Sequence, residues 1–260
     1  MIDIQITDIS IVIAFWLAFT KMLAINFQLP IYDNLPIPGI VKILSTLLIT
    51  YCFFPYIQNE ILRDIAYVGV DHFTMLTIIY SIIGITIGYL VKSIMQIYIS
   101  AGSIITQQIG FAAVRYFDPS SGQQVGPFEK LIQWSILIII VSSGALIPMF
   151  KGVFSSFFTV HAYSLGKMAS SHIFFMDLFK GIFSAALMLA SPLIFTNMLI
   201  NTILGIIART VPQMNIIMVS FSVNIGLGLL VFFATSEEFF HVGFKIYTEK
   251  LGDWFQLLIL

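Results

Sequence analysis

Long apolar runs, separated by short polar segments, make up most of this chain. About 20 consecutive apolar residues are enough for an α-helix to cross the hydrocarbon core of a bilayer. Six runs approach this length and are each expected to form a helix: residues 9–29, 38–57, 73–99, 131–150, 173–207 and 214–233. An amphipathic tail, residues 234–260, follows the last run. The pattern therefore predicts an all-α membrane protein with about six hydrophobic helices.

The fifth run is longer than one membrane crossing requires. At a rise of 1.5 Å per residue, about 35 residues extend ~50 Å, against a hydrocarbon core of ~30 Å. Pro192 lies inside this run, where it predicts a kink or a break. Four polar residues occur at spacings of three or four, which puts each pair on one helix face. They are Asp177, Lys180, Asn197 and Asn201. We therefore expect this helix to be surrounded by protein over part of its length.

The stretch between the third and fourth runs, residues 100–127, fits neither a membrane span nor a hydrated loop. Arg115, Asp118 and Pro119 interrupt it, although much of it is apolar or aromatic. Irregular backbone at membrane depth is stable only where protein surrounds it or where it faces a water-filled cavity. The sequence thus favours a protein that encloses a passage, which this apolar stretch obstructs. A loop that packs against neighbouring helices without any gating role is the alternative.

Composition narrows the class of protein further. Of 260 residues, 58% are hydrophobic and 10% are charged, whereas soluble domains carry about 25% charged residues. The net charge of −1 offers no basic field for nucleic acid. Cys52 is the single cysteine, which excludes an intrachain disulfide and a cysteine metal cage.

Candidate catalytic groups do not form a known constellation in this sequence. A nucleophile elbow, a zinc-protease motif and a phosphate-binding loop with a lysine are all missing. The four histidines are scattered over connectors and the tail. We therefore predict a protein that is not an enzyme and that needs neither a cofactor nor a metal.

Charged residues inside the apolar runs are the remaining candidates for special roles. Lys21 lies within the first run, where a charge is costly and usually faces protein, water or a partner charge. Alternatively, the Lys21 side chain extends toward the membrane interface and keeps its charge in water. Asp177 and Lys180, three residues apart in the fifth run, are expected to be buried charges with a structural role.

Several motifs together resemble the FliR/SctT family of type III secretion export-gate subunits. A glycine, a Gln-Ile-Gly and a Phe-Asp-Pro follow one another within the interrupted stretch. An Arg-x-x-Pro-Gln-x-Asn motif follows the long fifth run. The residues that carry the resemblance include Lys21, Gly102, Gln108, Ile109, Gly110, Phe117, Asp118, Pro119, Arg209, Pro212, Gln213 and Asn215. The resemblance covers residues 21–233, although the family usually has Arg where this chain has Lys21.

The resemblance implies a non-enzymatic subunit of a protein export channel. It implies that FliP-like and FliQ-like subunits join the chain in a hetero-oligomer, and that an FlhB-like protein is a further partner. The family assembly passes unfolded flagellar proteins across the bacterial inner membrane at the flagellar basal body. Its injectisome members serve a related export system.

The family also implies roles for particular residues. It implies a FliP-like part over residues 1–172, with a plug loop at about 101–130, and a FliQ-like hairpin over residues 173–233. The residues expected to form the channel plug are Gly110, Phe111, Val114, Tyr116, Phe117, Asp118 and Pro119. The hairpin tip, with Arg209, Pro212 and Gln213, is expected to contact a partner. A simple helix-terminus turn is the alternative at this tip.

A small-solute or ion secondary transporter is the alternative function. In that interpretation Asp177, Lys180, Asn197 and Asn201 would line a midplane site beside a helix broken at Pro192.

Overall fold

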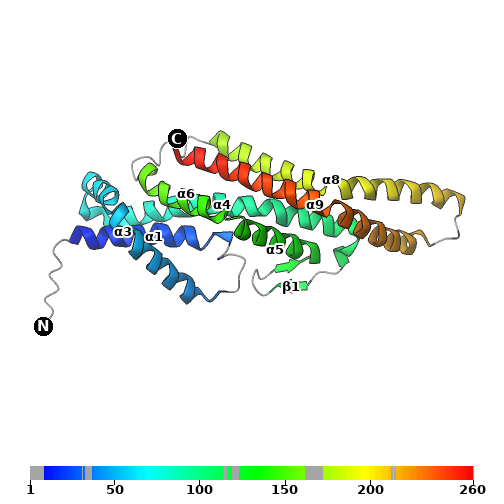
Figure 1. Ribbon diagram of the computed structural model, residues 1–260, viewed down its shortest axis with the longest axis horizontal. Helices are drawn as coiled ribbons and strands as arrows, with labels where there is room; N and C mark the ends of the chain where they lie inside the picture. The colour runs from blue at the N-terminus through cyan, green and yellow to red at the C-terminus, as the bar shows by residue number, and fades with distance from the viewer. Residues whose placement is uncertain are drawn as a thin grey trace. The chain divides into compact units, whose positions relative to one another are not determined.

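The computed structural model describes residues 9–30, 32, 37–113, 116–118, 123–161, 172–211, 213 and 215–259 (Figure 1). Seven α-helices account for most of them: α1 (Ile9–Asn26), α3 (Gly39–Val68), α4 (Phe73–Ile109), α5 (Pro127–Ser142), α6 (Leu146–Thr159), α8 (His172–Thr210) and α9 (Ile216–Ile259). Two short 3-10 helices, η1 (Val70–His72) and η2 (Phe111–Ala113), flank α4. Strands β1 (Tyr116–Asp118) and β2 (Gln123–Val125) form a small antiparallel pair between η2 and α5.

The helices confirm the prediction of about six hydrophobic spans. Five of them are long and apolar enough to cross a membrane: α1, α3, α4, α8 and α9. The pair α5 and α6 qualifies as a sixth span if its two helices, bent by 80°, are taken together. The chain is therefore a multi-pass helical membrane protein.

The bend between α5 and α6 replaces the single fourth helix that the hydrophobic run predicts. Gly144 has a φ of 74°, in the left-handed region that favours glycine. The N–H of Ala145 donates to the carbonyl of Ile140, and the N–H of Gly144 to that of Val141. These two bonds form a Schellman motif, which ends α5 whatever the hydropathy of the residues that follow.

The structure contradicts the predicted break at Pro192, because α8 is continuous from His172 to Thr210. Proline lacks an N–H, so the carbonyl of Met188, four residues earlier, loses its usual donor. The Ser191 hydroxyl donates to that carbonyl at 2.8 Å. The carbonyl of Pro192 itself accepts from Thr196. The Ser191 hydroxyl thus replaces the donor that proline removes.

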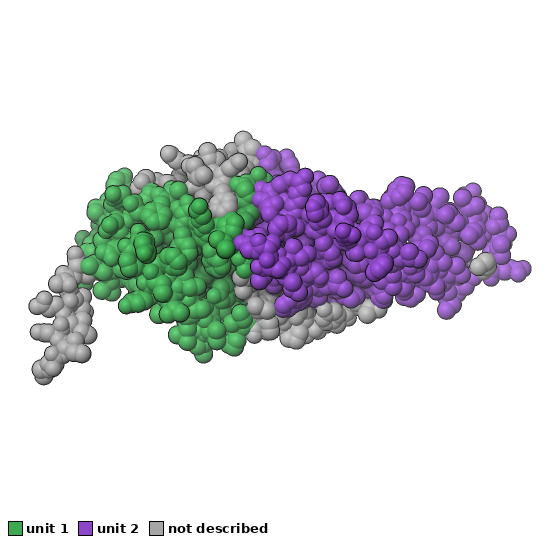
Figure 2. Space-filling view, viewed as in Figure 1, with its two compact units in different colours: residues 1–92, 146–175, 251–260 green, residues 93–145, 176–250 purple. Residues whose placement is uncertain are grey.

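The tail beyond residue 233 continues α9, which is one helix of 44 residues. The structure divides into two compact units (Figure 2). Unit 1 contains residues 1–92, 146–175 and 251–260, and unit 2 contains residues 93–145 and 176–250. This division follows packing, whereas the predicted division at residues 172 and 233 follows a family resemblance and stays a prediction.

In unit 1, α4 approaches α1 closely through two glycines. A Cβ at Gly84 would lie 2.6 Å from the carbonyl oxygen of Lys21, and one at Gly88 would lie 3.1 Å from the Cα of Ile25. The spacing of four residues puts both glycines on one face of α4, where larger side chains would force the helices apart. The close α1–α4 contact positions Lys21 within the unit.

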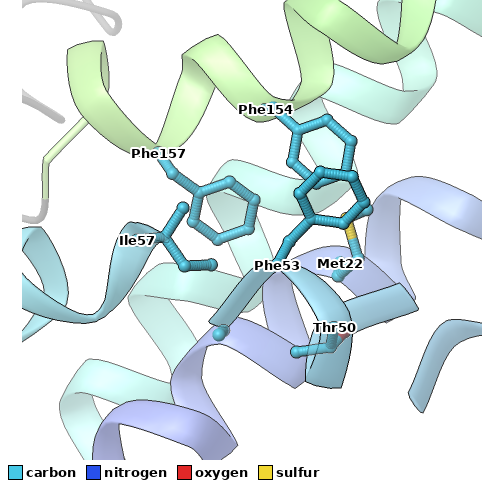
Figure 3. A pocket seen from close by; sticks show the side chains of 7 residues that line it. Met22, Thr50, Phe53, Ile57, Phe154 and Phe157 are labelled. Carbon is cyan, nitrogen blue, oxygen red and sulfur yellow. The ribbon is translucent and has the colours of Figure 1, made fainter. Parts of the chain in front are cut away.

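Aromatic side chains join α3 to α6 in the same unit. Figure 3 shows a small apolar recess with Met22, Thr50 and Ile57 on its walls. The rings of Phe53 and Phe154 stack there with their centroids 3.8 Å apart. The Thr50 hydroxyl donates back to its own helix, so the recess presents apolar surface.

Candidate functional site

Residues 110–126, here called the central segment, leave α4 at a sharp turn in unit 2. Gly110 has a φ of 94°, a conformation that other residues rarely adopt, and it ends α4. The segment continues through η2 and returns through the β1–β2 pair. In that pair Tyr116 lies opposite Val125, Phe117 opposite Gln124, and Asp118 opposite Gln123. Val114 and Pro119 lie outside the described residues. The predicted irregular loop therefore contains a short hairpin.

The C-terminal end of the central segment packs tightly on α4. Gly126 lies against Thr106, where a Cβ would come within 2.6 Å of the Thr106 Cγ2. Val125 is buried, and so is Thr106, whose hydroxyl donates to the carbonyl of Gly102. Gly102 in turn lies against the backbone of Glu129, at the start of α5. Any side chain at either glycine would separate the segment or α5 from α4.

Aromatic contacts connect the start of the segment to α5 and α9. The ring centroids of Phe111 and Phe128 are 6.0 Å apart, and those of Phe128 and Phe232 are 5.0 Å apart in an edge-to-face arrangement. Phe128 is buried and Phe111 is half-buried. Such pairs add stability beyond the area they bury. Both ends of the central segment are thus anchored within unit 2.

The α8–α9 hairpin holds the last turn of α4. Asn197 Nδ2 donates to the carbonyl of Gln108 at 2.6 Å, and Asn201 Nδ2 donates to Asn197 Oδ1. On the α9 side, a Cβ at Gly110 would lie 3.7 Å from Ile225 Cγ1. The end of α4, from Gln108 to Gly110, is therefore in contact with both helices of the hairpin.

Lys21 is buried at the centre of unit 1, with 1% of its surface exposed. Its Nζ donates to the carbonyls of Ser156 at 2.7 Å and Val160 at 3.5 Å, at the C-terminal end of α6. The same ammonium lies 4.3 Å from the ring centroid of Phe157. A cation at a helix C-terminus offsets the negative end of the helix dipole, and the ring face adds a cation–π contact.

Asp64 belongs to the same cluster and was not anticipated from the sequence. It is 1% exposed, accepts a hydrogen bond of 2.8 Å from the Tyr80 hydroxyl, and lies 3.3 Å from His161 Nδ1. Its signal in the sequence is the apolar stripe Ile57, Ile61 and Ile65 of α3, which continues through a segment rich in polar residues. Asp64 lies on the same helix face as this stripe.

The structure differs from the prediction of buried charges at Asp177 and Lys180. Both are exposed on the surface of this chain, near the start of α8. The buried positions of this region, Leu178 and Ile182, lie four residues apart and form the face that packs on the protein. Asp177 and Lys180 fall outside that face.

Comparisons with known proteins place the chain in a family. The family model "Bacterial export proteins, family 1" matches residues 12–249. The chain belongs to this family. The match includes α3, α4, α5, α6 and α8 in full, and with them the central segment and the cluster around Lys21.

Individual relatives in the export family carry names from both flagella and injectisomes. "Flagellar biosynthetic protein FliR" of Bacillus subtilis (strain 168) is 23% identical over 95% of each chain. The protein of that name from Pectobacterium carotovorum subsp. carotovorum is 28% identical over 83% of this chain and 81% of its own length. "Yop proteins translocation protein T" of Yersinia pestis is 26% identical over 68% of each chain. The chain is thus a member of the FliR/SctT family.

The predicted tip of the FliR/SctT hairpin lies between α8 and α9. Arg209 is exposed in the last turn of α8, and Gln213 is exposed in the turn that follows. Pro212 lies outside the described residues. An exposed guanidinium next to an exposed amide offers several hydrogen-bond donors to a partner.

Proposed function

We propose that this chain is a non-enzymatic subunit of the type III protein export gate, in which the central segment is the channel plug. In this role it joins FliP-like and FliQ-like subunits, which together with an FlhB-like protein form a conduit for unfolded flagellar proteins. The conduit crosses the bacterial inner membrane at the flagellar basal body. Residues 1–172 supply the FliP-like part and residues 173–233 the FliQ-like hairpin.

The family match over residues 12–249 carries this proposal. The geometry of unit 2 supports it, because the central segment is irregular, apolar at Phe111 and Val125, and anchored at both ends. A protein-conducting channel needs such an obstruction at rest, since a polypeptide-wide opening would dissipate ion gradients. Apolar side chains close a pore by excluding water from its narrowest part.

The geometry disfavours a secondary transporter. Transporter sites use broken helices, whose ends point at the substrate in mid-membrane. Here α8 passes through Pro192 without a break, and Asp177 and Lys180 are exposed. The Asn197 amide is engaged with Gln108.

Co-expression distinguishes the two functions. A gate subunit is expected to form a stable particle in mild detergent only with FliP-like and FliQ-like partners, because its exposed apolar helix faces need covering. Size and composition of the purified particle provide the measurement, with the chain expressed alone as the control. Purification of the chain alone, as a monodisperse monomer or symmetric homo-oligomer, would contradict the gate assignment.

The hairpin tip is the proposed contact for the FlhB-like partner. Arg209 and Gln213 are expected to make charge-assisted and amide hydrogen bonds there. A photo-crosslinker at position 213 should therefore capture the FlhB-like protein in the assembled gate. One at Phe195, an exposed position midway along α8, serves as the matched control. Capture of only lipid or solvent from position 213 would leave the tip as a simple turn.

A further inference from the structure

We propose that Asn197 is a positioning residue for the plug: its hydrogen bond to Gln108 holds the start of the central segment to the α8–α9 hairpin. This inference rests on the proposed function. It connects the site that contacts a partner to the site that closes the channel.

The acceptor of this bond is a carbonyl that the fold leaves without its usual partner. In an α-helix the carbonyl of Gln108 would accept from the N–H four residues later. Here α4 ends at Ile109, Gly110 turns the chain, and the following residues form η2. The orphan carbonyl at this helix end needs a donor, because an unsatisfied polar group inside protein or membrane is costly. Asn197 Nδ2 supplies that donor at 2.6 Å.

The donor is held in place from its own helix. Asn201, one turn further along α8, donates its Nδ2 to Asn197 Oδ1. Because this bond occupies Asn197 Oδ1, the Asn197 amide is oriented with its Nδ2 toward α4. Placing two asparagines in a strongly apolar helix costs free energy in a membrane protein. A specific hydrogen-bond partner for their amides offsets that cost. Here that partner is the backbone of Gln108, in the last turn of α4 just before the central segment.

Contacts on the α9 side complete the attachment. A Cβ at Gly228 would lie 3.2 Å from the Cα of Ile109, so α9 and the last turn of α4 are in close contact. The position of Gly110 faces Ile225 and Phe221 of the same helix. The end of α4 therefore contacts both α8 and α9, and the central segment that begins at Gly110 is held to the hairpin through these contacts.

The hairpin extends from this contact to the proposed partner site. Arg209 is twelve residues beyond Asn197 on the same helix, a distance of about 18 Å along its axis. A continuous helix transmits a displacement of its end over such a length. Binding at the tip would thereby bias the plug through Asn197.

Asn197→Leu tests the inference, because leucine has nearly the same shape and no donor. In cells that express the whole gate, this variant should raise ion leakage about fivefold, the change expected for one hydrogen bond, at an unchanged yield of assembled particle. Asn197→Gln retains an amide donor and should leak less than Asn197→Leu. Asn224→Leu is the matched control, since Asn224 donates to Ser220 of its own helix and should leave leakage at background.

Two further variants separate positioning from general damage. In a gate that already lacks residues 110–122, Asn197→Leu should add no leakage, because the plug that the substitution would release is absent. If Asn197→Leu lowers particle yield, Asn201→Leu replaces it, with an expected rise of about twofold because it only loosens the Asn197 amide.

The outcomes distinguish this inference from the proposed function. If the deletion leaks while Asn197→Leu and Asn201→Leu stay at background, the positioning role is overturned and the plug stands. If the deletion itself does not leak, the plug assignment fails. If Asn197→Leu adds leakage in the deletion background, its effect does not act through the plug, and the inference also fails.

Discussion

Deletion of residues 110–122 is expected to make cells that express the complete gate leak ions at rest. The deletion removes η2 and β1, and with them the proposed obstruction of the channel. The increase should be on the order of tenfold or more, since a loss of only about 1.4 kcal/mol in closed-state preference changes an equilibrium tenfold. Conductance or uptake of a small ion that is normally excluded provides the measurement.

This experiment needs proof that the gate still assembles. The deletion begins at Gly110 and stops before Val125 and Gly126, so the packing of the segment's end on Thr106 stays in place. Particle yield should therefore be close to that of the unaltered gate. Alanine at Ser120 and Ser121, polar positions of the same segment, is the matched control and should not leak. Background conductance from an intact deleted particle would rule out the plug.

Asp64→Asn is expected to destabilise the chain strongly. The substitution preserves shape and an acceptor for Tyr80, but it removes the negative charge that interacts with Lys21 and lies beside His161. Removing one member of a buried charge cluster leaves the other charge uncompensated, which costs about 3 kcal/mol or more. For a chain of this size that corresponds to a fall of roughly 6–12 °C in thermal midpoint. Thermal unfolding of the purified protein in detergent measures it.

The matched control lies one turn earlier in α3. Glu60 pairs with Arg63, whose side chain is exposed, and Glu60→Gln should cost less than about 1 kcal/mol. The double variant Lys21→Met with Asp64→Asn should recover part of the loss, because it removes both charges together. Equal midpoints for Asp64→Asn and Glu60→Gln, or a double variant whose losses simply add, would mean that the cluster contributes no electrostatic stability.

Much of this architecture could be predicted from the sequence because hydropathy is a local property. Runs of about 20 apolar residues become helices in a membrane whatever they pack against, since every backbone group must then be paired within its own segment. The same argument singled out Lys21 as a costly charge and residues 100–127 as a stretch that needs surrounding protein. The spacing of Gly84 and Gly88 is visible in the sequence, but it does not show that α1 is the helix they contact.

Local side-chain chemistry changed the boundaries of several elements. The Schellman motif at Gly144 divides one apolar run into two helices, while the Ser191 hydroxyl lets α8 pass through Pro192. Neither effect alters the hydropathy of the run in which it occurs. The predicted elements therefore differ from the structure where local hydrogen bonds decide whether a helix continues.

By itself, the sequence determined that this is a multi-pass helical protein of the bacterial export family, with an irregular apolar segment between its third and fourth spans. Only the tertiary structure decided which groups meet. Asp64 and His161 are 97 positions apart, and Gln108 and Asn197 are 89 apart. Their pairing depends on which helix faces pack together, and periodicity along one helix shows a face without naming its neighbour.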